Sequence, residues 1–428
     1  MTWTQRPVMV RGARLVDPGE GLDEVGDCLV ADGRIRALGG RGDADGAQVI
    51  EAEGLWLVPG LVDPHVHLRE PGLTHKEDIA TGARAAVAGG FVAVAAMPNT
   101  RPVVDSPELI TYVRMRSDAV GLCRVLPVGA ITRGQAGREL AQIGDMAAAG
   151  AVALSDDGQG VQSAGMMRCA LRYASAFGLP LLLHEQDDTL AGDGVVHEGA
   201  VATRLGLAGQ PREAEEAMVL RDVHLVERNG GRIHLCHLST AGAVQVVREA
   251  KARGLRVSAE VTPHHLLLTD EAARGYDTRA KCNPPLRTDG DRRALVDGLV
   301  DGTIDCIATD HAPHTDDEKE GDFVSAAFGI SGLETALALV LTHLVDSGRL
   351  SPAALVERMS FGPCRVLGLC RHRLREGAVA NLTLIDPGVR WTVEPQRFHS
   401  RGHATPFAGA RLKGRSRGVF VDGRWMAS

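Results

Sequence analysis

The sequence lacks the features that mark several large classes of protein. It contains no Cys-x-x-Cys pair, no apolar stretch long enough to cross a membrane, and no Gly-x-x-x-x-Gly-Lys-Ser/Thr loop that would cradle a phosphate. Basic charge is not in excess either: 47 lysines and arginines stand against 54 aspartates and glutamates, a formal net charge of −7, which argues against a nucleic-acid-binding protein. The first residues lack the apolar core of a secretory signal peptide. We therefore expect a soluble cytoplasmic protein that binds neither nucleic acid nor membrane.

The cysteines support the same location. The chain has eight, scattered as Cys28, Cys123, Cys169, Cys236, Cys282, Cys306, Cys364 and Cys370. Several lie inside apolar runs, so we expect buried thiols in a reducing compartment rather than disulfides.

The dominant pattern in the sequence is a repeat of short apolar runs, rich in Val, Ile, Leu and Ala, separated by stretches of helical character. Such alternation is typical of βα units and a parallel sheet. Eight runs occupy residues 55–68, 91–99, 123–131, 151–158, 179–185, 232–239, 256–265 and 303–314. We therefore predict a closed (β/α)₈ TIM barrel over residues 58–368, somewhat longer than the ~250 residues typical of this fold.

Both ends of the chain are predicted to be rich in β-structure. Asp32-Gly33 and Asp422-Gly423 each separate two apolar runs, which is a hairpin signal. We predict one small β-sandwich domain built from residues 1–57 and 369–428, because a small split sheet needs both halves to bury a face. Two unrelated β-extensions are the alternative.

Polar residues gather where the predicted barrel strands end, which is where TIM barrels carry their catalytic groups. In chain order these ends hold His65 and His67, Asn99, Asp156 and Asp157, His184, His237, and Asp310, His311 and His314. His65 and His67 are two residues apart, so both imidazoles point to the same side of a strand and can share a metal ion. The alternative is a pair of half-buried histidines bonded to backbone carbonyls.

Imidazole and carboxylate groups from separate strand ends favour Zn²⁺. Without compensation, buried charges at the mouth of the barrel would be costly, and a metal supplies that compensation. The six candidate ligands exceed the three or four of one catalytic zinc. We therefore predict two ions that share a bridging carboxylate and a bridging water.

Long motifs in the chain closely resemble those of dihydroorotases of the bacterial long-chain (class I) type, within the amidohydrolase superfamily. They are GLVDPHVHLREPG (60–72), AMPNT (96–100), LSDDGQGVQSAGMM (154–167), HLCHLST (234–240), EVTPHHLLLT (260–269), ATDHAPH (308–314) and FGISGLET (328–335). The resemblance covers nearly the whole chain, with the motifs in the expected order. It implies a zinc-dependent enzyme that reversibly cyclises N-carbamoyl-L-aspartate to (S)-dihydroorotate in de novo pyrimidine (UMP) biosynthesis.

The resemblance also implies a ligand set. In it His65, His67 and Asp310 bind one zinc ion, His184 and His237 bind the other, and Asp157 bridges both, with Asp156 as the next candidate. Related dihydropyrimidinases and allantoinases generally bridge their metals with a carboxylated lysine on the fourth strand, and this chain has no lysine between Lys76 and Lys251. That absence excludes the lysine-bridged site and leaves a carboxylate as the bridge.

On the substrate side, the resemblance implies that Arg69, Asn99 and His314 hold the substrate carboxylate, while Asn283 and the backbone at Phe328 and Gly329 contact the ring. Asp310 would take a proton from the attacking water and deliver it to the ring nitrogen. The guanidinium of Arg69 suits a carboxylate, although an ion pair with Glu70 or Glu77 is the alternative. Asn99 could equally be a turn residue. His265 and His311 are expected to pack against the site or to support its ligands.

Two other functions stay open: another cyclic-amide hydrolase, allantoinase-like or dihydropyrimidinase-like, and an inactive dihydroorotase-like subunit that scaffolds aspartate carbamoyltransferase. A scaffold should have lost metal ligands, and none is missing here. A homodimer is the expectation from the resemblance, and aspartate carbamoyltransferase is a candidate partner.

Two further segments carry expectations. The polar segment 315–322 is either a lid over the site or a solvated surface loop, and its place after the last barrel strand favours the lid. Residues 414–418 (GRSRG) match the Gly-x-Ser-x-Gly pattern of a nucleophile elbow. With no apolar strand before them and no helix after them, we expect a surface loop there instead.

Overall fold

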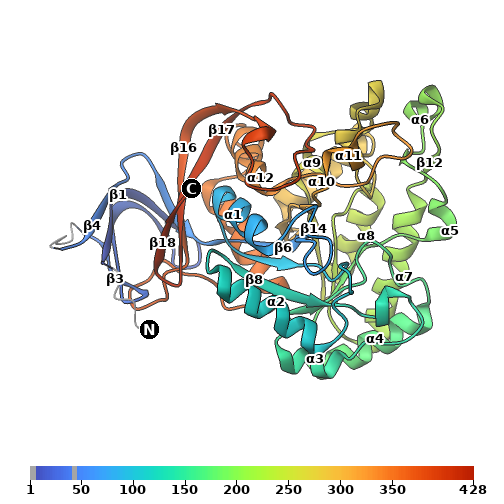
Figure 1. The fold of residues 1–428 in the computed structure, drawn as a ribbon, viewed down its shortest axis with the longest axis horizontal. Helices are drawn as coiled ribbons and strands as arrows, with labels where there is room; N and C mark the ends of the chain where they lie inside the picture. The colour runs from blue at the N-terminus through green and yellow to red at the C-terminus, as the bar shows by residue number, and fades with distance from the viewer. Residues whose placement is uncertain (1–5, 41–45) are drawn as a thin grey trace.

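The structure is a computed structural model that describes residues 6–40 and 46–428. A barrel wrapped in helices forms one part of the molecule, and a sheet that combines both chain ends stands beside it (Figure 1). Residues 1–5 and 41–45, which the predicted terminal β domain and the expectation about the chain start include, lie outside the described residues.

Each of the eight predicted runs contains a barrel strand. The strands are β6 (Leu61–Val66), β7 (Phe91–Ala96), β8 (Arg124–Gly129), β9 (Ala153–Leu154), β10 (Leu181–Leu183), β13 (Ile233–Leu235), β14 (Val257–Val261) and β15 (Cys306–Ile307). They pair in parallel and in this order. A parallel bridge between Val66 and His311, and a 2.8 Å hydrogen bond from the His67 N–H to the His311 carbonyl, join the last segment to the first. The barrel is thus nearly closed, which confirms the predicted fold class.

A helix follows each barrel strand and covers the outside of the barrel. These helices are α1 (Ile79–Gly89), α2 (Pro107–Val120), α3 (Ile143–Ala149), α4 (Ala164–Ala176), α7 (Glu213–Asn229), α8 (Ala241–Ala252), α10 (Asp289–Asp301) and α12 (Leu333–Val340). Shorter helices are α5 (Asp188–Ala191), α6 (Ala200–Leu205), α9 (Pro263–Leu267), α11 (Asp316–Lys319), α13 (Pro352–Val356) and α14 (Gly362–Leu367), and β11 (Val196–His197) pairs with β12 (Gly209–Gln210). Helix α1 illustrates the local signals: Asp78 accepts the Thr81 N–H at its start, and Gly90 takes a φ of 90° at its end.

Both chain ends contribute to the second sheet. Its strands are β1 (Val8–Asp17), β2 (Leu22–Ala31), β3 (Arg34–Gly39), β4 (Gln48–Glu51), β5 (Trp56–Pro59), β16 (Leu382–Thr392), β17 (Arg411–Val421) and β18 (Arg424–Ala427). The order is β18-β17-β16-β5-β1-β2-β3, with β4 beside β1. The antiparallel pairing of β5 with β16 joins the two ends of the chain, so they are not unrelated extensions. The exact domain boundaries remain predictions.

The two predicted hairpins are present in this sheet. Asp32 and Gly33, between β2 and β3, have φ values of 50° and 77°, and Asp422 and Gly423, between β17 and β18, have 51° and 81°. Two consecutive positive φ values are typical of the tight turns that match the twist of a hairpin. The sheet has its own apolar core, which includes Leu15, Ile35, Leu57, Leu382 and Phe420.

The expectation for residues 414–418 is wrong. They lie within β17, between β16 and β18, and not in a surface loop. Arg415 and Arg417 are exposed while Ser416 and Gly418 are buried, so the segment alternates as a strand does. The Ser416 hydroxyl lies 2.8 Å from that of Ser428, which gives it a structural partner in the sheet.

The cysteines are all free, as expected, but Cys169 and Cys370 are exposed while the other six are buried. Among the described residues, no helix combines the length and the apolar character that a membrane crossing requires.

Candidate metal centre and active site

A cavity of about 190 Å³ opens where the barrel strands end. It is smaller than the ~300–1,000 Å³ of pockets for drug-sized ligands, so its size suits a small molecule such as a single ring. All six residues predicted to contact substrate line it: Arg69, Asn99, Asn283, His314, Phe328 and Gly329. Five predicted metal ligands also line it: His67, Asp157, His184, His237 and Asp310. The sixth, His65, is fully buried next to His67.

His65, His67 and Asp310 form the first group of ligand atoms. The two Nε2 atoms lie 3.3 Å apart, and Asp310 Oδ1 lies 3.5 Å from that of His65 and 3.1 Å from that of His67. The Nδ1 atom of His65 lies 2.7 Å from Glu260, and that of His67 lies 2.8 Å from Asn99 Oδ1. Both of these partners accept, so each ring carries an N–H at Nδ1. The two Nε2 atoms then face each other and a carboxylate, and in the neutral rings their lone pairs would be free to bind a cation.

His184 and His237 form the second group, and Asp157 lies between the two groups. His184 Nδ1 and His237 Nε2 lie 3.0 Å apart. Asp157 Oδ1 is 3.7 Å from His184 and 3.4 Å from His237. Its Oδ2 is 3.5 Å from His65 and 3.3 Å from His67. One carboxylate that offers one oxygen to each histidine pair has the geometry of a bridging ligand.

Asp156, the other candidate for the bridge, points elsewhere. Its Oδ1 accepts the N–H groups of Ile131 at 2.9 Å and Thr132 at 3.1 Å, and its Oδ2 accepts the Thr132 hydroxyl. It therefore ties the end of β9 to the segment after β8. The structure places Asp157 and not Asp156 between the histidines, and the role as a metal ligand stays a prediction.

Burial and charge act in opposite directions on Asp157. Burial alone would raise its pKa, but the charge of His65 and hydrogen bonds from His184 and His237 hold the pKa well below its usual range. An ionised carboxylate at the centre of the cluster is the form that binds a metal.

Glu260 contacts the histidine cluster, and the sequence interpretation assigned it no role. It is fully buried on β14. Its Oε1 accepts from His65 Nδ1 at 2.7 Å and from the His237 N–H at 3.3 Å, and its Oε2 lies 2.9 Å from His234 Nε2. Burial opposes its ionisation, but the charge of His65 and the bonds from both imidazoles lower its pKa to about 2. A carboxylate behind a ligating histidine fixes the ring and its tautomer. The available signal was a lone acid in an otherwise apolar barrel strand.

Three site residues have positive φ angles, which residues other than glycine rarely adopt. The φ values are 60° for Arg69, 33° for His237 and 46° for Asp310. Such strain gathers at functional sites when the surrounding structure holds it. Here it accompanies the turn of these side chains into the cavity, and no motif in the sequence predicted it.

Arg69 faces the cavity and is not engaged by the carboxylates weighed as its alternative partners. Its Nε donates to the Pro313 carbonyl at 3.2 Å, and its Nη2 lies 3.2 Å from His314 Nε2. Glu70 instead accepts from Arg116 and Tyr112, and Glu77 lies beside His311 and accepts from Ser400. Burial lowers the pKa of Arg69 to about 10, so the guanidinium stays charged at neutral pH.

His314, His311 and His265 differ in their surroundings. Burial first, and the charge of Arg69 second, lower the pKa of His314 to about 3, which leaves a neutral imidazole on the cavity wall. His311 Nδ1 accepts the Gly332 N–H at 3.1 Å, and its Nε2 lies 3.3 Å from Glu77. His265 has the Thr262 hydroxyl and the Pro284 carbonyl as partners. His311 and His265 do not line the cavity, and their supporting role stays a prediction.

The polar segment after the last barrel strand is anchored by a buried lysine. Lys319, only 5% exposed, donates to the carbonyls of Lys281 at 3.3 Å, Ala327 at 2.8 Å and Gly329 at 3.0 Å. Lys281 Nζ donates to the carbonyls of Val324 and Ala326 and lies 4.3 Å from the centre of the Phe328 ring. Two ammonium groups thus hold the wall that Phe328 and Gly329 form. Residues 315–322 are therefore not simply a solvated surface loop, because Lys319 is buried within them. Their action as a lid stays a prediction.

The chain is similar over nearly its full length to known enzymes. A family model described as "Dihydro-orotase-like" matches residues 54–243. The dihydroorotase of Anaeromyxobacter sp. (strain K) is 53% identical over 420 residues, 97% of each chain. The dihydroorotase of Pelotomaculum thermopropionicum is 52% identical over 417 residues, again 97% of each chain.

Solved structures share the fold. The L-hydantoinase (dihydropyrimidinase) from Arthrobacter aurescens has a TM-score of 0.87 at 25% identity, over 99% of this chain and 96% of that one. The dihydropyrimidinase from Brevibacillus agri has a TM-score of 0.85 at 20% identity, over 98% and 95% of the two chains.

Proposed function

Because the chain belongs to the dihydroorotase family, we propose that it interconverts N-carbamoyl-L-aspartate and (S)-dihydroorotate, the ring-closing step of de novo pyrimidine biosynthesis. It is a cyclic-amide hydrolase, as its relatives are. The observation that carries the proposal is the Asp157 carboxylate, which lies between two histidine pairs in a cavity faced by the buried guanidinium of Arg69.

The residues present fit a pair of zinc ions. Four imidazoles and two carboxylates converge, and the Nε2 atoms of His65 and His67 lie 3.3 Å apart, facing Asp157 and Asp310. Zn²⁺ prefers such nitrogen and oxygen ligands. His65, His67 and Asp310 would hold one ion, His184 and His237 would hold the other, and Asp157 would serve both. When bound, the ions would polarise the reacting carbonyl and lower the pKa of a water molecule.

The substrate would be oriented by the opposite wall. Arg69 supplies a fixed positive charge for the carboxylate outside the ring, and Asn99 and neutral His314 supply hydrogen bonds to the same group. Asn283 and the backbone at Phe328 and Gly329 would contact the ring. Asn99 has a second task, because its Oδ1 also accepts from His67 Nδ1.

Asp310 is placed to move a proton. It faces the cavity, and hydrogen bonding to His67 and the charge of His65 lower its pKa against the effect of burial. In hydrolysis, a water oxygen bonds to the ring carbonyl carbon, the ring C–N bond breaks, and Asp310 carries the water proton to the leaving nitrogen. In the reverse direction, Asp310 accepts the proton of the ureido nitrogen as that nitrogen bonds to the side-chain carboxyl carbon. The bond from this carbon to one carboxyl oxygen breaks, and Asp310 returns the proton to that oxygen, which leaves as water.

The alternative functions gain no support. The hydantoinases match in fold at 25% identity or less, whereas the dihydroorotases match at about half of all positions over 97% of the chain. An inactive scaffold is disfavoured because every predicted ligand is present and lies in one cluster.

We further propose a homodimer in the cytoplasm, with aspartate carbamoyltransferase as a candidate partner. The eight free cysteines support a reducing compartment. Light scattering of the purified chain, alone and with the carbamoyltransferase, tests the assembly.

The function is tested by following carbamoyl aspartate cyclisation and dihydroorotate hydrolysis with the purified chain, before and after chelation and after zinc is restored. We expect turnover in both directions that chelation abolishes and zinc recovers. Turnover only with hydantoin or dihydrouracil would favour the other hydrolases, and no metal-dependent turnover by the isolated chain would favour the scaffold.

A further inference from the structure

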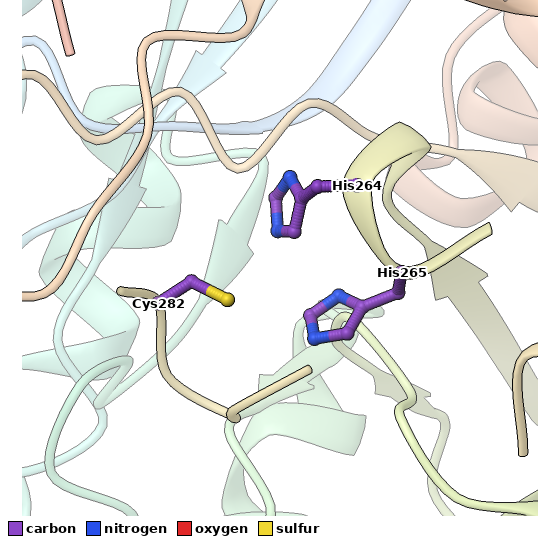
Figure 2. A group of neighbouring side chains, drawn as sticks. All are labelled: His264, His265 and Cys282. Carbon is purple, nitrogen blue, oxygen red and sulfur yellow. The ribbon is translucent and has the colours of Figure 1, made fainter. Parts of the chain in front are cut away.

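A second group of ligand-type side chains lies apart from the bridged cluster. His264 and His265 belong to α9, and Cys282 immediately precedes Asn283. Each is only 2% exposed, and one ligand atom from each lies within 4.8 Å of the other two. Figure 2 shows the three side chains around a common space. We propose that His264, His265 and Cys282 form a further cation site for Zn²⁺, distinct from the pair around Asp157.

The hydrogen bonds of His265 fix which of its nitrogens carries the proton. Its Nε2 lies 3.0 Å from the Pro284 carbonyl, which can only accept, so Nε2 carries the proton. Nδ1 then carries the lone pair, which accepts from the Thr262 hydroxyl 2.8 Å away, so a metal ion at Nδ1 would replace that hydrogen bond. Ligating histidines commonly donate their other ring N–H to a backbone carbonyl in this way, which fixes the tautomer.

His264 supplies an independent indication of a ligand. Its Nε2 atom is buried without a hydrogen-bond partner. In Figure 2 this edge of the ring points toward the space between Cys282 and His265. Buried polar atoms without partners are rare and call for an explanation, such as an ion. Burial also lowers the pKa of His264 to about 4, so the imidazole is neutral, as a ligand must be.

The three ligand atoms lie close enough together that a short inward movement would bring them to bonding distance of an ion. Three atoms within 4.8 Å of one another have a central point about 2.8 Å or less from each, against the ~2.0–2.3 Å of zinc–nitrogen and zinc–sulfur bonds. Cys282 Sγ now donates to the Pro284 carbonyl at 3.3 Å. On binding, the sulfur–hydrogen bond breaks, a sulfur–metal bond forms, and the proton leaves to solvent. Burial raises the pKa of this thiol to about 12, so only a cation with high affinity for sulfur completes the exchange.

In the other two groups that contain a cysteine, the histidine already has a carboxylate as its hydrogen-bond partner. In the groups with Cys236 and with Cys306, the imidazoles of His65 and His234 already bond to Glu260. Among the described residues, the group with Cys282 is the one that combines a thiol with an imidazole nitrogen lacking a partner.

A cation at this site would connect the barrel to the substrate wall. His264 and His265 follow β14, while Cys282 leads into Asn283, whose Nδ2 lies 3.3 Å from His184 Nε2 and which lines the cavity. The ion would hold Asn283 in place. This consequence rests on the proposed function, whereas the binding of the ion does not.

The test uses the full-length protein, stripped of metal and titrated with Co²⁺, a cation whose thiolate complexes give a sulfur-to-metal charge-transfer band. We expect the wild type to take up one equivalent more than Cys282→Ser and to show the band. Cys282→Ser and His264→Gln should both lose the band, while Cys306→Ser, another buried thiol, should keep it. Wild-type protein without the band at saturating Co²⁺, or a band unchanged in Cys282→Ser, overturns the proposal.

Turnover measured on the same samples separates the two proposals. A thiolate band without dihydroorotase activity would contradict the proposed function alone. Activity without the band would contradict the further cation site alone. The wild-type protein alone can overturn the proposal, because it must show the band at saturating Co²⁺. The test therefore does not depend on whether a variant folds.

Discussion

The two sides of the cavity are held by different kinds of contact. On the metal side, side chains outside the predicted ligand set orient imidazoles, as Glu260 orients His65 and Asn99 orients His67. On the substrate side, the wall at Phe328 and Gly329 is held by lysine ammonium groups that bond to backbone carbonyls. A missing partner on the metal side leaves a histidine of the cluster without the group that orients it, whereas a missing lysine would loosen the backbone at Phe328 and Gly329. Changes on the metal side should therefore abolish metal binding and turnover together, and changes on the wall should affect substrate binding.

The largest effect is expected for Asp157→Ala, which removes the carboxylate between the histidine pairs. Activity should fall by more than the ~10–100-fold that the loss of a supporting partner costs, and the metal content should fall with it. Turnover and elemental analysis of the purified variant measure both. If Asp157→Ala kept its full metal content and rate, the bridging assignment would be wrong, and Asp156 would be the next candidate.

Glu260→Gln should cost ~10–100-fold in metal affinity or activity, because the neutral amide no longer balances His65 and His234. A competition titration with a chelator gives the affinity. Glu334→Gln is the matched control: Glu334 is also largely buried, but it accepts the backbone N–H groups of His399 and Ser400. Equal losses in the two variants would mean that Glu260 acts only through stability.

Arg69→Met tests the substrate side. We expect normal metal content and a loss of roughly tenfold or more in kcat/KM, since a hydrogen bond to a charged group contributes ~1.5–3 kcal/mol. Most of the change should appear in KM. Depletion of the metals in this variant would show that the two sides are not separable.

The smallest effect is expected for Lys319→Met, with KM raised about 2- to 10-fold, the equivalent of one ordinary hydrogen bond. Burial lowers the pKa of Lys319 to about 8, and the groups that face it are Lys281, Cys282 and Asp277. As pH rises through 8 the ammonium is lost, so the wild-type KM should rise there while that of Lys319→Met stays flat. Lys413→Met, which removes a more exposed lysine paired with Asp346, is the control.

A rise in KM above pH 8 could come from a loosened substrate wall or from a less stable fold. The effect of Lys319 on the free energy of unfolding separates these two explanations. Its folded pKa lies below the ordinary value of 10.5, so between these values the unfolded chain binds more protons. This group's contribution to the free energy of unfolding therefore rises with pH in that window. A KM that rises above pH 8 cannot then be ascribed to Lys319 destabilising the fold, and denaturant unfolding at pH 7.5 and 9 checks the sign.

The barrel, and the gathering of polar residues at its mouth, could be predicted because both follow from local patterns. Apolar runs identified all eight strands, and the polar residues at their ends do line one cavity, with His65 directly behind His67. Their individual roles as metal ligands came from the resemblance and stay predictions. The Asp32-Gly33 and Asp422-Gly423 turns were equally local signals.

The remaining features depend on contacts that the sequence does not display. Glu260 meets His65 only because the barrel brings together residues 195 positions apart. Lys319 has backbone carbonyls as partners, and these carry no signature in the sequence. Asp156 and Asp157 are adjacent, so only the direction of the backbone after β9 separates them. Residues 414–418 were misassigned because glycine and arginine obscured a strand whose buried positions are small.

Anomalous diffraction at the zinc edge, from crystals of the protein grown with zinc, tests the central claim most directly. Our account predicts two peaks on either side of Asp157, one beside His65, His67 and Asp310 and the other beside His184 and His237. A fully active crystalline enzyme with no peak next to Asp157 would contradict it.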